Sequence, residues 1–286
     1  MITETAYGKI NLGLHILGRR DDGYHEVSMI MQSVGLCDKV ILEEAKEPGI
    51  TIATNVSGLS CGPDNLAYKA AQLLADRYGI EPRVKITLEK KIFLAAGLAG
   101  GSSDAAAVLR GLNKLWQLNL DNQVLEDLGA QLGSDIPFCI EGGTMLATGR
   151  GEVLTKLQDL PQAWVVLAKP KGLEVSTAWV YKNYNPGRVI HWPKIWMLQD
   201  KLQEGCEALV PYMANVLETA TIPAHPVIAS VKAAMLSAGA YFAMMSGSGP
   251  TVFALASSQE QAEKIEQALG RFDLETAVTT TVGRMK

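Results

Sequence analysis

A glycine-rich turn between a strand and a helix is the feature that most constrains this chain. It spans residues 95–104 and reads Ala-Ala-Gly-Leu-Ala-Gly-Gly-Ser-Ser-Asp. Before the turn, apolar and polar residues alternate over 84–89, as in a half-buried strand. After it, apolar residues recur at helical spacing and predict a helix with one buried stripe: Ala105, Val108, Leu109, Leu112, Leu115 and Trp116.

Such a turn is suited to binding an anion. The first N–H groups of a helix have no partner within it, and the helix dipole makes this end positive, so phosphate is favoured there. Ser102 and Ser103 can cap the helix or donate to phosphate oxygens. An ordinary glycine-rich connection is the alternative. The turn has no P-loop Gly-Lys-Ser/Thr, and Gly97, Gly100 and Gly101 miss the dinucleotide-binding spacing.

Length and composition exclude several classes of protein. With 286 residues, 48% of them hydrophobic and 20% charged, the chain is globular and long enough for two domains. A net charge of −4 and a pI near 5.7 disfavour a nucleic-acid-binding face. Four cysteines without a Cys-x-x-Cys pair predict free buried thiols in a reducing, cytoplasmic compartment. The histidines show no metal-ligand spacing, and no signal peptide is visible.

The uncharged segment 233–259 invites a transmembrane assignment, but Gly-Ser-Gly-Pro at 247–250 divides it into arms too short to span a bilayer. We expect a core helix, a strand around 243–245, a tight loop and a strand over 251–255. Another buried strand begins at Trp164. We therefore predict an N-terminal domain over 1–155 and a C-terminal domain over 156–286, of mixed α+β class.

The first predicted strand carries polar residues on one face. Ile10, Leu12, Leu14 and Ile16 share one side, and the period of two places Lys9, Asn11 and His15 on the other. A lysine beside an asparagine suits phosphoryl transfer, which needs positive charge near the reacting oxygens and a donor that orients the substrate. Taken alone, a lysine at this position is more often a solvated strand residue, and only the other motifs favour a site role for Lys9.

A candidate base lies in Gly133-Ser134-Asp135-Ile136-Pro137. We expect Gly133 to end a helix and Pro137 to keep Ile136 out of helical geometry, which places Asp135 on a short rigid turn. A carboxylate there can accept the proton of an attacking hydroxyl. A purely local capping role for Asp135 stays open.

The glycine turn, the segment 133–137 and the segment 245–251 together resemble the motifs of the GHMP kinases, which include galactokinase and homoserine, mevalonate and phosphomevalonate kinases. Phe93 stands where that family has a proline, and Ala95 where it has a glycine. The resemblance runs from Lys9 to Thr251. It implies a two-domain α+β fold, with an N-terminal domain like domain 2 of ribosomal protein S5, a ferredoxin-like C-terminal domain and an interdomain active site.

The resemblance also implies roles for individual residues. Asp135 would be the base and Lys9 its catalytic partner. Mg²⁺ is expected with ATP, and Ser103 could contact either the metal or a phosphate. The residues that would bind ATP are Leu94, Ala95, Ala96, Gly97, Leu98, Ala99, Gly100, Gly101, Ser102, Ser103 and Asp104.

The segment 20–25 has the pattern Arg-x-Asp-Gly-Tyr-His. Together with Lys-Ile-Asn-Leu at 9–12, it resembles one branch of the family, whose acceptor is a cytidine diphosphate-linked polyol of isoprenoid-precursor synthesis. By itself it is a hairpin turn with an exposed aromatic residue. The resemblance implies that Tyr24, His25 and Tyr181 recognise cytosine. Further substrate contacts would come from Asn11, Gly247, Ser248 and Gly249. The segment 149–152 also matches the family, although a surface turn explains it equally well.

Other functions stay open at this level. One alternative is a GHMP kinase that acts on homoserine or a mevalonate derivative, and such a kinase would need no cytosine-recognising site. A non-catalytic nucleotide sensor would bind ATP without turnover, and the acidic pI argues against an RNA-binding module. We expect small-molecule partners, with neither nucleic acid nor membrane, and predict no oligomeric state. Within 183–209, Trp192 and Trp196 are expected to be packing residues.

Overall fold

The computed structural model describes residues 1–285 and divides by contact into two compact units. The first unit comprises 1–8, 37–92 and 99–142, and the second comprises 9–36, 93–98 and 143–286. Strands β1 (Ile2–Arg19) and β2 (His25–Glu44) each contribute to both units. Because the units are built from interleaved segments, they do not correspond to one cut in the chain, and a boundary at 155/156 stays a prediction.

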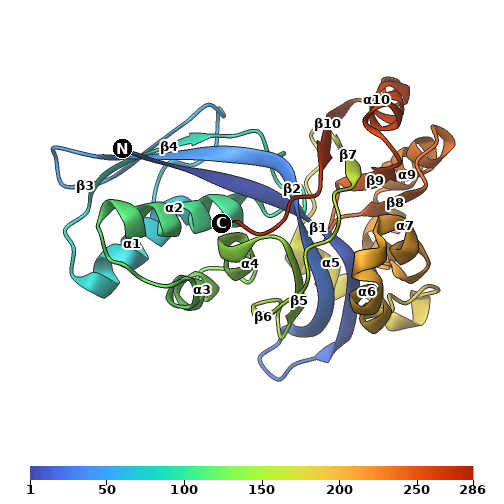
Figure 1. The fold of residues 1–286 in the computed structure, drawn as a ribbon, viewed down its shortest axis with the longest axis horizontal. Coiled ribbons are helices and arrows are strands. Elements are labelled where there is room, and N and C mark those ends of the chain that lie inside the picture. Colours follow the sequence, from blue (N-terminus) through green and yellow to red (C-terminus); the bar gives the residue numbers. More distant parts are fainter. Residues whose placement is uncertain (286) are drawn as a thin grey trace. The chain divides into compact units, whose positions relative to one another are not determined.

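The remaining elements follow in chain order (Figure 1). The further strands are β3 (Gly49–Thr54), β4 (Arg83–Glu89), β5 (Thr144–Thr148), β6 (Val153–Lys156), β7 (Trp164–Pro170), β8 (Phe242–Met245), β9 (Val252–Ala256) and β10 (Leu274–Thr280). The α-helices are α1 (Leu66–Tyr78), α2 (Gly100–Leu115), α3 (Asn122–Ala130), α4 (Ile136–Glu141), α5 (Thr177–Asn183), α6 (Ile195–Lys201), α7 (Cys206–Leu209), α8 (Glu218–Ala224), α9 (Val227–Ser237) and α10 (Gln259–Ala268). Short 3₁₀ turns are η1 (Pro186–Arg188), η2 (Leu202–Glu204) and η3 (Val210–Tyr212).

In the first unit, helices pack together beside a short sheet. Strand β4 pairs parallel with β3 and antiparallel with the end of β2. Helix α1 packs on α2, and α4 packs on α2 and α3. Local chemistry explains the limits of α1: the side chain of Asn65 accepts a hydrogen bond from the N–H of Ala67, and Gly79 ends the helix with φ of 64°.

The second unit contains an antiparallel sheet of order β10-β7-β9-β8. Its elements run β7, α9, β8, β9, α10 and β10 along the chain, and both helices pack on the sheet (Figure 1). This split β-α-β arrangement is ferredoxin-like, as expected. The same unit holds the hairpin of β5 and β6, and β5 pairs with the first part of β2.

The strand–turn–helix prediction is confirmed by β4 and α2. The prediction of a single buried stripe on α2 is wrong, however, because Ser103–Leu112 are buried on all sides. Neighbours on several faces bury the helix, and periodicity alone cannot reveal how many faces are covered. The uncharged segment folds as α9, β8 and β9, and within residues 1–285 no helix is long and apolar enough to cross a bilayer.

The cysteines are all free, as predicted, but they are not all buried. Cys139 and Cys206 are buried, Cys37 is half-buried and Cys61 is exposed. Cysteine spacing reports the lack of a disulfide framework and carries no information on burial.

Candidate active site

Lys9 and Asn11 lie side by side on β1 in the second unit. The ammonium Nζ of Lys9 donates to Oδ1 of Asn11 at 3.0 Å, and Nδ2 of Asn11 contacts Sδ of Met29 at 3.2 Å. Lys9 is 5% exposed and Asn11 is fully buried. The interpretation of Lys9 as a solvated strand residue is therefore wrong. A buried lysine needs polar partners, because desolvation penalises an unpaired charge.

Further along β1, the face that carries Lys9 and Asn11 is covered by a segment from far along the chain. A Cβ atom on Gly13 would lie 2.5 Å from Cδ1 of Leu198 and 3.4 Å from Cβ of Pro193. The ring of His15 lies 5.0 Å from that of Trp192. Glycine at position 13 thus permits a close approach that helps exclude water beside Asn11.

The Gly-Ser-Gly-Pro loop meets the glycine turn and Lys9 within the second unit. The hydroxyl of Ser246 donates to the carbonyl oxygen of Gly97 at 3.0 Å. A Cβ on Gly97 would overlap the carbonyl oxygen of Ser246, and one on Gly247 would lie 3.3 Å from Nζ of Lys9. Lys9 also donates its backbone N–H to the carbonyl of Leu98 at 3.0 Å. Three segments widely separated in sequence are therefore in contact at Lys9.

Ser248 is held by two residues that the sequence did not single out. Its hydroxyl lies 2.9 Å from Oγ1 of Thr177, and its carbonyl accepts from Oγ1 of Thr221 at 3.2 Å. Ser248 is buried, and so is Thr221. Both threonines belong to segments without any motif, so no local signal could have found them.

Helix α2 begins at Gly100, earlier than a serine cap would allow. Its N-cap is Ala99, in the left-handed region with φ of 59° and without a side-chain capping bond. The N–H of Ser103 already bonds the Ala99 carbonyl at 2.8 Å, so the first turn directs the N–H groups of Gly100, Gly101 and Ser102 out of its end. The prediction that either serine caps the helix is wrong.

The hydroxyl of Ser103 points into the first unit. It donates to the carbonyl of Tyr7 at 2.6 Å and lies 3.3 Å from Sγ of Cys139. Because this hydroxyl is buried and already donates its proton, only its lone pairs could serve a ligand. The backbone of the turn, rather than this side chain, supplies the donors suited to phosphate.

A buried ionic cluster lies behind the first turn of α2. Lys90 bonds Oδ2 of Asp104 at 2.5 Å and also bonds Oδ2 of Asp38. Oδ1 of Asp38 accepts from the N–H groups of Lys91 and Ile92, at 2.5 and 2.7 Å. Burial raises the pKa of Asp104 to about 7, and Asp38 adds to that effect. Asp104, predicted to bind ATP, thus anchors the turn through Lys90.

Asp135 is the N-cap of α4 and makes no side-chain capping bond there. Two expectations around it are wrong. Helix α3 ends with Gln131 rather than Gly133 as its C-cap, and Ile136 is the first helical residue of α4. Proline is tolerated in a first helical turn because its missing N–H would have no partner there, so Pro137 starts this helix instead of breaking it.

The predicted cytosine-recognising residues separate into two pairs. The ring of His25 lies 5.3 Å from that of Tyr181, at an interplanar angle of 39°. The ring of Tyr24 is covered instead by the guanidinium of Arg150, 5.0 Å from the ring centroid. Burial, and then the charge of Arg19, lower the pKa of His25 below its ordinary value, which favours the neutral imidazole.

Arg150 sits in the turn between β5 and β6, in the segment whose match to the family was ambiguous. The N–H of Gly149 donates to Glu26 at 3.1 Å, and Arg150 pairs with Glu152 at 3.3 Å. Gly149 and Gly151 are buried, and Arg150 and Glu152 are half-buried, so the segment is a partly buried turn that contacts the hairpin bearing Tyr24.

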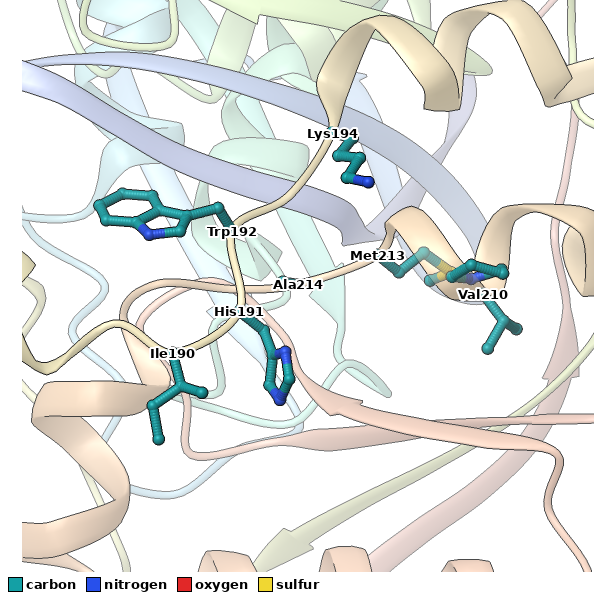
Figure 2. Close-up of a pocket in the computed structure, with 8 residues that line it drawn as sticks. Ile190, His191, Trp192, Lys194, Val210, Met213 and Ala214 are labelled. Atoms are coloured by element: carbon teal, nitrogen blue, oxygen red, sulfur yellow. The ribbon is translucent and has the colours of Figure 1, made fainter.

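A pocket of about 520 Å³ lies elsewhere in the second unit (Figure 2). Its walls come from 190–194 and 210–214. Figure 2 shows the side chains of His191, Trp192 and Lys194 pointing in three different directions. Trp192 is 43% and Trp196 67% exposed, so the expectation that both are packing residues is wrong for Trp196.

Residues 1–285 contain no group of three or more His, Cys, Asp or Glu side chains placed to hold a metal ion. Mg²⁺ commonly keeps several waters and binds substrate phosphates with only one or two protein ligands.

The comparisons with known proteins agree with this geometry. The family model described as GHMP kinases N terminal domain matches residues 65–143, and that described as GHMP kinases C terminal matches 197–274. A solved homoserine kinase from Cytophaga hutchinsonii, 21% identical, has the same fold with a TM-score of 0.75, covering 99% of this chain and 96% of that one. The fold and the motifs define a GHMP kinase.

Relatives with higher sequence identity show which GHMP kinases this chain is most similar to among those compared. A 4-diphosphocytidyl-2-C-methyl-D-erythritol kinase of Acetivibrio thermocellus is 46% identical over 98% of this chain and 99% of its own length. The crystal structure of a 4-(cytidine 5'-diphospho)-2C-methyl-D-erythritol kinase is 33% identical, with a TM-score of 0.85 and coverage of 99% and 100%. The chain belongs to the 4-diphosphocytidyl-2-C-methyl-D-erythritol kinase family.

Proposed function

We propose that this chain is an ATP-dependent kinase that phosphorylates the 2-hydroxyl of 4-diphosphocytidyl-2-C-methyl-D-erythritol. The observation that carries the proposal is the His25–Tyr181 ring pair, in the same unit as Lys9 and Asn11. Kinases for homoserine or mevalonate have no base to recognise, and the relatives named above do not favour them.

The ATP phosphates would bind along residues 94–104. Backbone N–H groups at the start of α2 supply donors, and the helix dipole favours the negative charge. Gly97 is pressed against Ser246, so the turn has a defined position within the second unit. ATP is the phosphoryl donor of GHMP kinases, and we propose that it binds with Mg²⁺, which neutralises charge on the β- and γ-phosphates.

Lys9 and Asp135 would carry the chemistry. The acceptor hydroxyl oxygen attacks the γ-phosphorus, and its proton passes to a carboxylate oxygen of Asp135. The bond from the γ-phosphorus to the bridging oxygen of ADP breaks as the new bond forms. The Lys9 ammonium stabilises negative charge on the transferring group, and Asn11 orients this ammonium through their 3.0 Å hydrogen bond. The products are the 2-phosphate and ADP.

The cytidine end of the acceptor would be recognised by His25 and Tyr181. An aromatic ring stacks on the base, and a neutral imidazole offers one donor and one acceptor to its polar edge. Tyr24 lies next to His25 in the β1–β2 hairpin, and Arg150, from the turn between β5 and β6, places its guanidinium over the ring of Tyr24. Gly247, Ser248 and Gly249 would line the same substrate site from their loop. Because the reaction consumes ATP, we also propose a cytoplasmic location.

The test is ADP release with Mg-ATP and four acceptors: the diphosphocytidyl methylerythritol, homoserine, mevalonate and phosphomevalonate. Turnover only with the cytidine-bearing acceptor, and its loss in Asp135→Asn, is the expected result. Turnover with another acceptor would refute the assigned substrate. ATP binding with no turnover on any acceptor would instead identify a nucleotide sensor.

A further inference from the structure

Asn215 lies in a segment that pairs with β1 beyond Asn11. The N–H of Leu14 donates to the carbonyl of Ala214 at 2.9 Å, and the N–H of Val216 donates to the carbonyl of Leu14 at 3.1 Å. Leu14 and Asn215 thus form a parallel bridge. The backbone on either side of Asn215 is tied to the strand that carries Lys9.

The side chain of Asn215 reaches from this bridge to the Gly-Ser-Gly-Pro loop. Its Nδ2 donates to the carbonyl oxygens of Met245 and Gly247, at 2.9 and 2.7 Å, and its Oδ1 accepts from the N–H of Leu217 at 2.9 Å. Asn215 is 4% exposed. Both amide donors and the acceptor are therefore used, and all the partners are backbone groups.

Gly247 in turn limits the space around Lys9. It has a positive φ of 55°, and a Cβ there would lie 3.3 Å from Nζ of Lys9 and 3.5 Å from Oδ1 of Asn11. The Gly247 carbonyl accepts from Nδ2 of Asn215, and this bond fixes the orientation of the Gly247 peptide beside Lys9.

A second contact steadies the start of the same loop. Oε1 of Glu218 accepts from the N–H of Met245 at 2.9 Å, and Glu218 pairs with Lys232 at 2.8 Å. Glu218 therefore bonds the N–H of Met245, whereas Asn215 bonds the carbonyls of Met245 and Gly247. Of these two side chains, Asn215 is the one that contacts Gly247, the residue next to Lys9.

We propose that Asn215 is a positioning residue for the phosphoryl transfer. It fixes the Gly247 peptide that borders Lys9 and Asn11, so that the ammonium keeps its place beside Asn11 and remains available to the transferring phosphoryl group. This inference deepens the proposed function and rests on it for the role of Lys9, whereas the structural link from Asn215 to Lys9 does not depend on the substrate.

Two substitutions test the link by kinetics. Asn215→Asp keeps the shape of the side chain but places an oxygen against the carbonyl oxygens of Met245 and Gly247. Asn215→Ser makes the side chain too short to bond them. We expect kcat to fall about 100-fold in each, as for a misplaced reacting group, with a much smaller rise in KM for the cytidine acceptor. Ser is the second variant should the buried charge of Asp prevent folding.

Asn113 provides the matched control. Its Nδ2 donates to the carbonyl of Leu120 and its Oδ1 accepts from the N–H of Leu120, both at 3.0 Å, in the first unit. Asn113→Ser also removes hydrogen bonds from an asparagine side chain to the backbone, two against the three of Asn215, and should lower the melting temperature without lowering kcat. Folded Asn215 variants with the kcat of wild type, or an equal loss of kcat in Asn113→Ser, would overturn the proposal.

A measurement that needs no acceptor substrate tests the role of Asn215 independently of the proposed kinase activity. The rate at which an acylating reagent modifies Lys9, followed by mass spectrometry with buried Lys90 as the internal reference, reports how firmly the loop covers Lys9. We expect that rate to rise on the order of tenfold in Asn215→Ser, because the hydrogen bonds that close the loop are lost. An unchanged rate refutes the positioning role even if no acceptor is turned over.

Discussion

The imidazole of His25 lies 5.3 Å from the phenol ring of Tyr181, at an interplanar angle of 39°. These residues are far apart in the chain, one at the start of β2 and the other in α5. Stacking of a nucleic-acid base on an aromatic side chain is worth about 1–3 kcal/mol. We expect Tyr181→Leu and His25→Ala to raise KM for the cytidine acceptor about 10- to 100-fold, with kcat and KM for ATP little changed.

A second histidine–aromatic pair gives the control for that experiment. The ring of His225 lies 6.4 Å from that of Trp179 in the same unit. Initial rates over a range of acceptor concentrations should show no change in KM for His225→Ala. A larger effect from His225→Ala than from His25→Ala would contradict the assignment of the cytosine-recognising pair.

The acceptor KM should depend on pH through His25. Burial and the charge of Arg19 lower the pKa of His25 below 6.5, so the neutral imidazole is the main form at pH 7. Protonation removes the acceptor nitrogen. KM should stay flat from pH 8 down to 6.5 and then rise, approaching about tenfold per pH unit under full titration.

Arg19→Gln removes one of the two causes that lower the pKa of His25. The pKa of His25 should then lie closer to its ordinary value, and the rise in KM should begin at a higher pH. An NMR titration of the imidazole protons measures the same shift directly. A KM that is flat down to pH 5, or an unchanged profile in Arg19→Gln, counts against neutral His25 as the recognising form.

The cluster of Lys90, Asp38 and Asp104 should make stability depend on pH. Because burial raises the pKa of Asp104 to about 7 in the folded state, the native protein binds more protons than the unfolded chain between about pH 4 and 7. Rising pH through this window therefore lowers the free energy of unfolding, by up to about 1.4 kcal/mol per pH unit. Urea unfolding at pH 5, 6, 7 and 8 measures the slope.

Asp104→Asn should flatten this slope, because the amide does not titrate. The control is Asp76→Asn, at an exposed residue whose carboxylate accepts from Gln72 at 2.7 Å. That variant should keep the wild-type slope. Identical slopes in wild type and Asp104→Asn would show that the carboxyl titrates alike in the folded and unfolded states.

Gly97→Ala should impair both stability and turnover. At φ of 73° an added Cβ is strained, and it would also lie against the backbone of Ser246 and 3.0 Å from the carbonyl oxygen of Gly249. Gly172→Ala isolates the first effect, since φ there is 67° but nothing lies within 4 Å of the added atom. Gly172→Ala should lower the free energy of unfolding by about 1 kcal/mol, and Gly97→Ala should lower it by more.

Chemical denaturation gives the two stabilities, and ADP release gives the two rates. Only Gly97→Ala should reduce kcat, because only that turn lies against the loop near Lys9. Equal losses in the two variants would mean that backbone strain alone, and not contact with Ser246, limits residue 97.

Much of the local structure was predictable. The alternation over 84–89 and the glycine turn led to β4 and the start of α2, and the interrupted apolar segment led to α9, β8 and β9. These features depend on backbone periodicity and on glycine and proline, which act within a few residues. The environment of Asp135 was predicted wrongly, because Pro137 is compatible with either breaking a helix or starting one.

The candidate site was predictable only as a set of residue types. The motifs named Lys9, Asn11 and Gly247, but nothing in their spacing told whether Lys9 is solvated or buried. Asn215 and Thr221 carry no motif, and they were found because their side chains bond the loop at 245–249.

The sequence by itself determined the chemistry that this protein can perform: a glycine turn opening a helix, a lysine and an aspartate for phosphoryl transfer, and a hairpin bearing tyrosine and histidine. Only the tertiary structure decided that Gly97, Gly247 and Asn215 are in contact around Lys9 and its neighbours. The physical reason is that hydrophobic periodicity records which side of an element is buried, whereas the partner that buries it is selected by the packing of the whole unit.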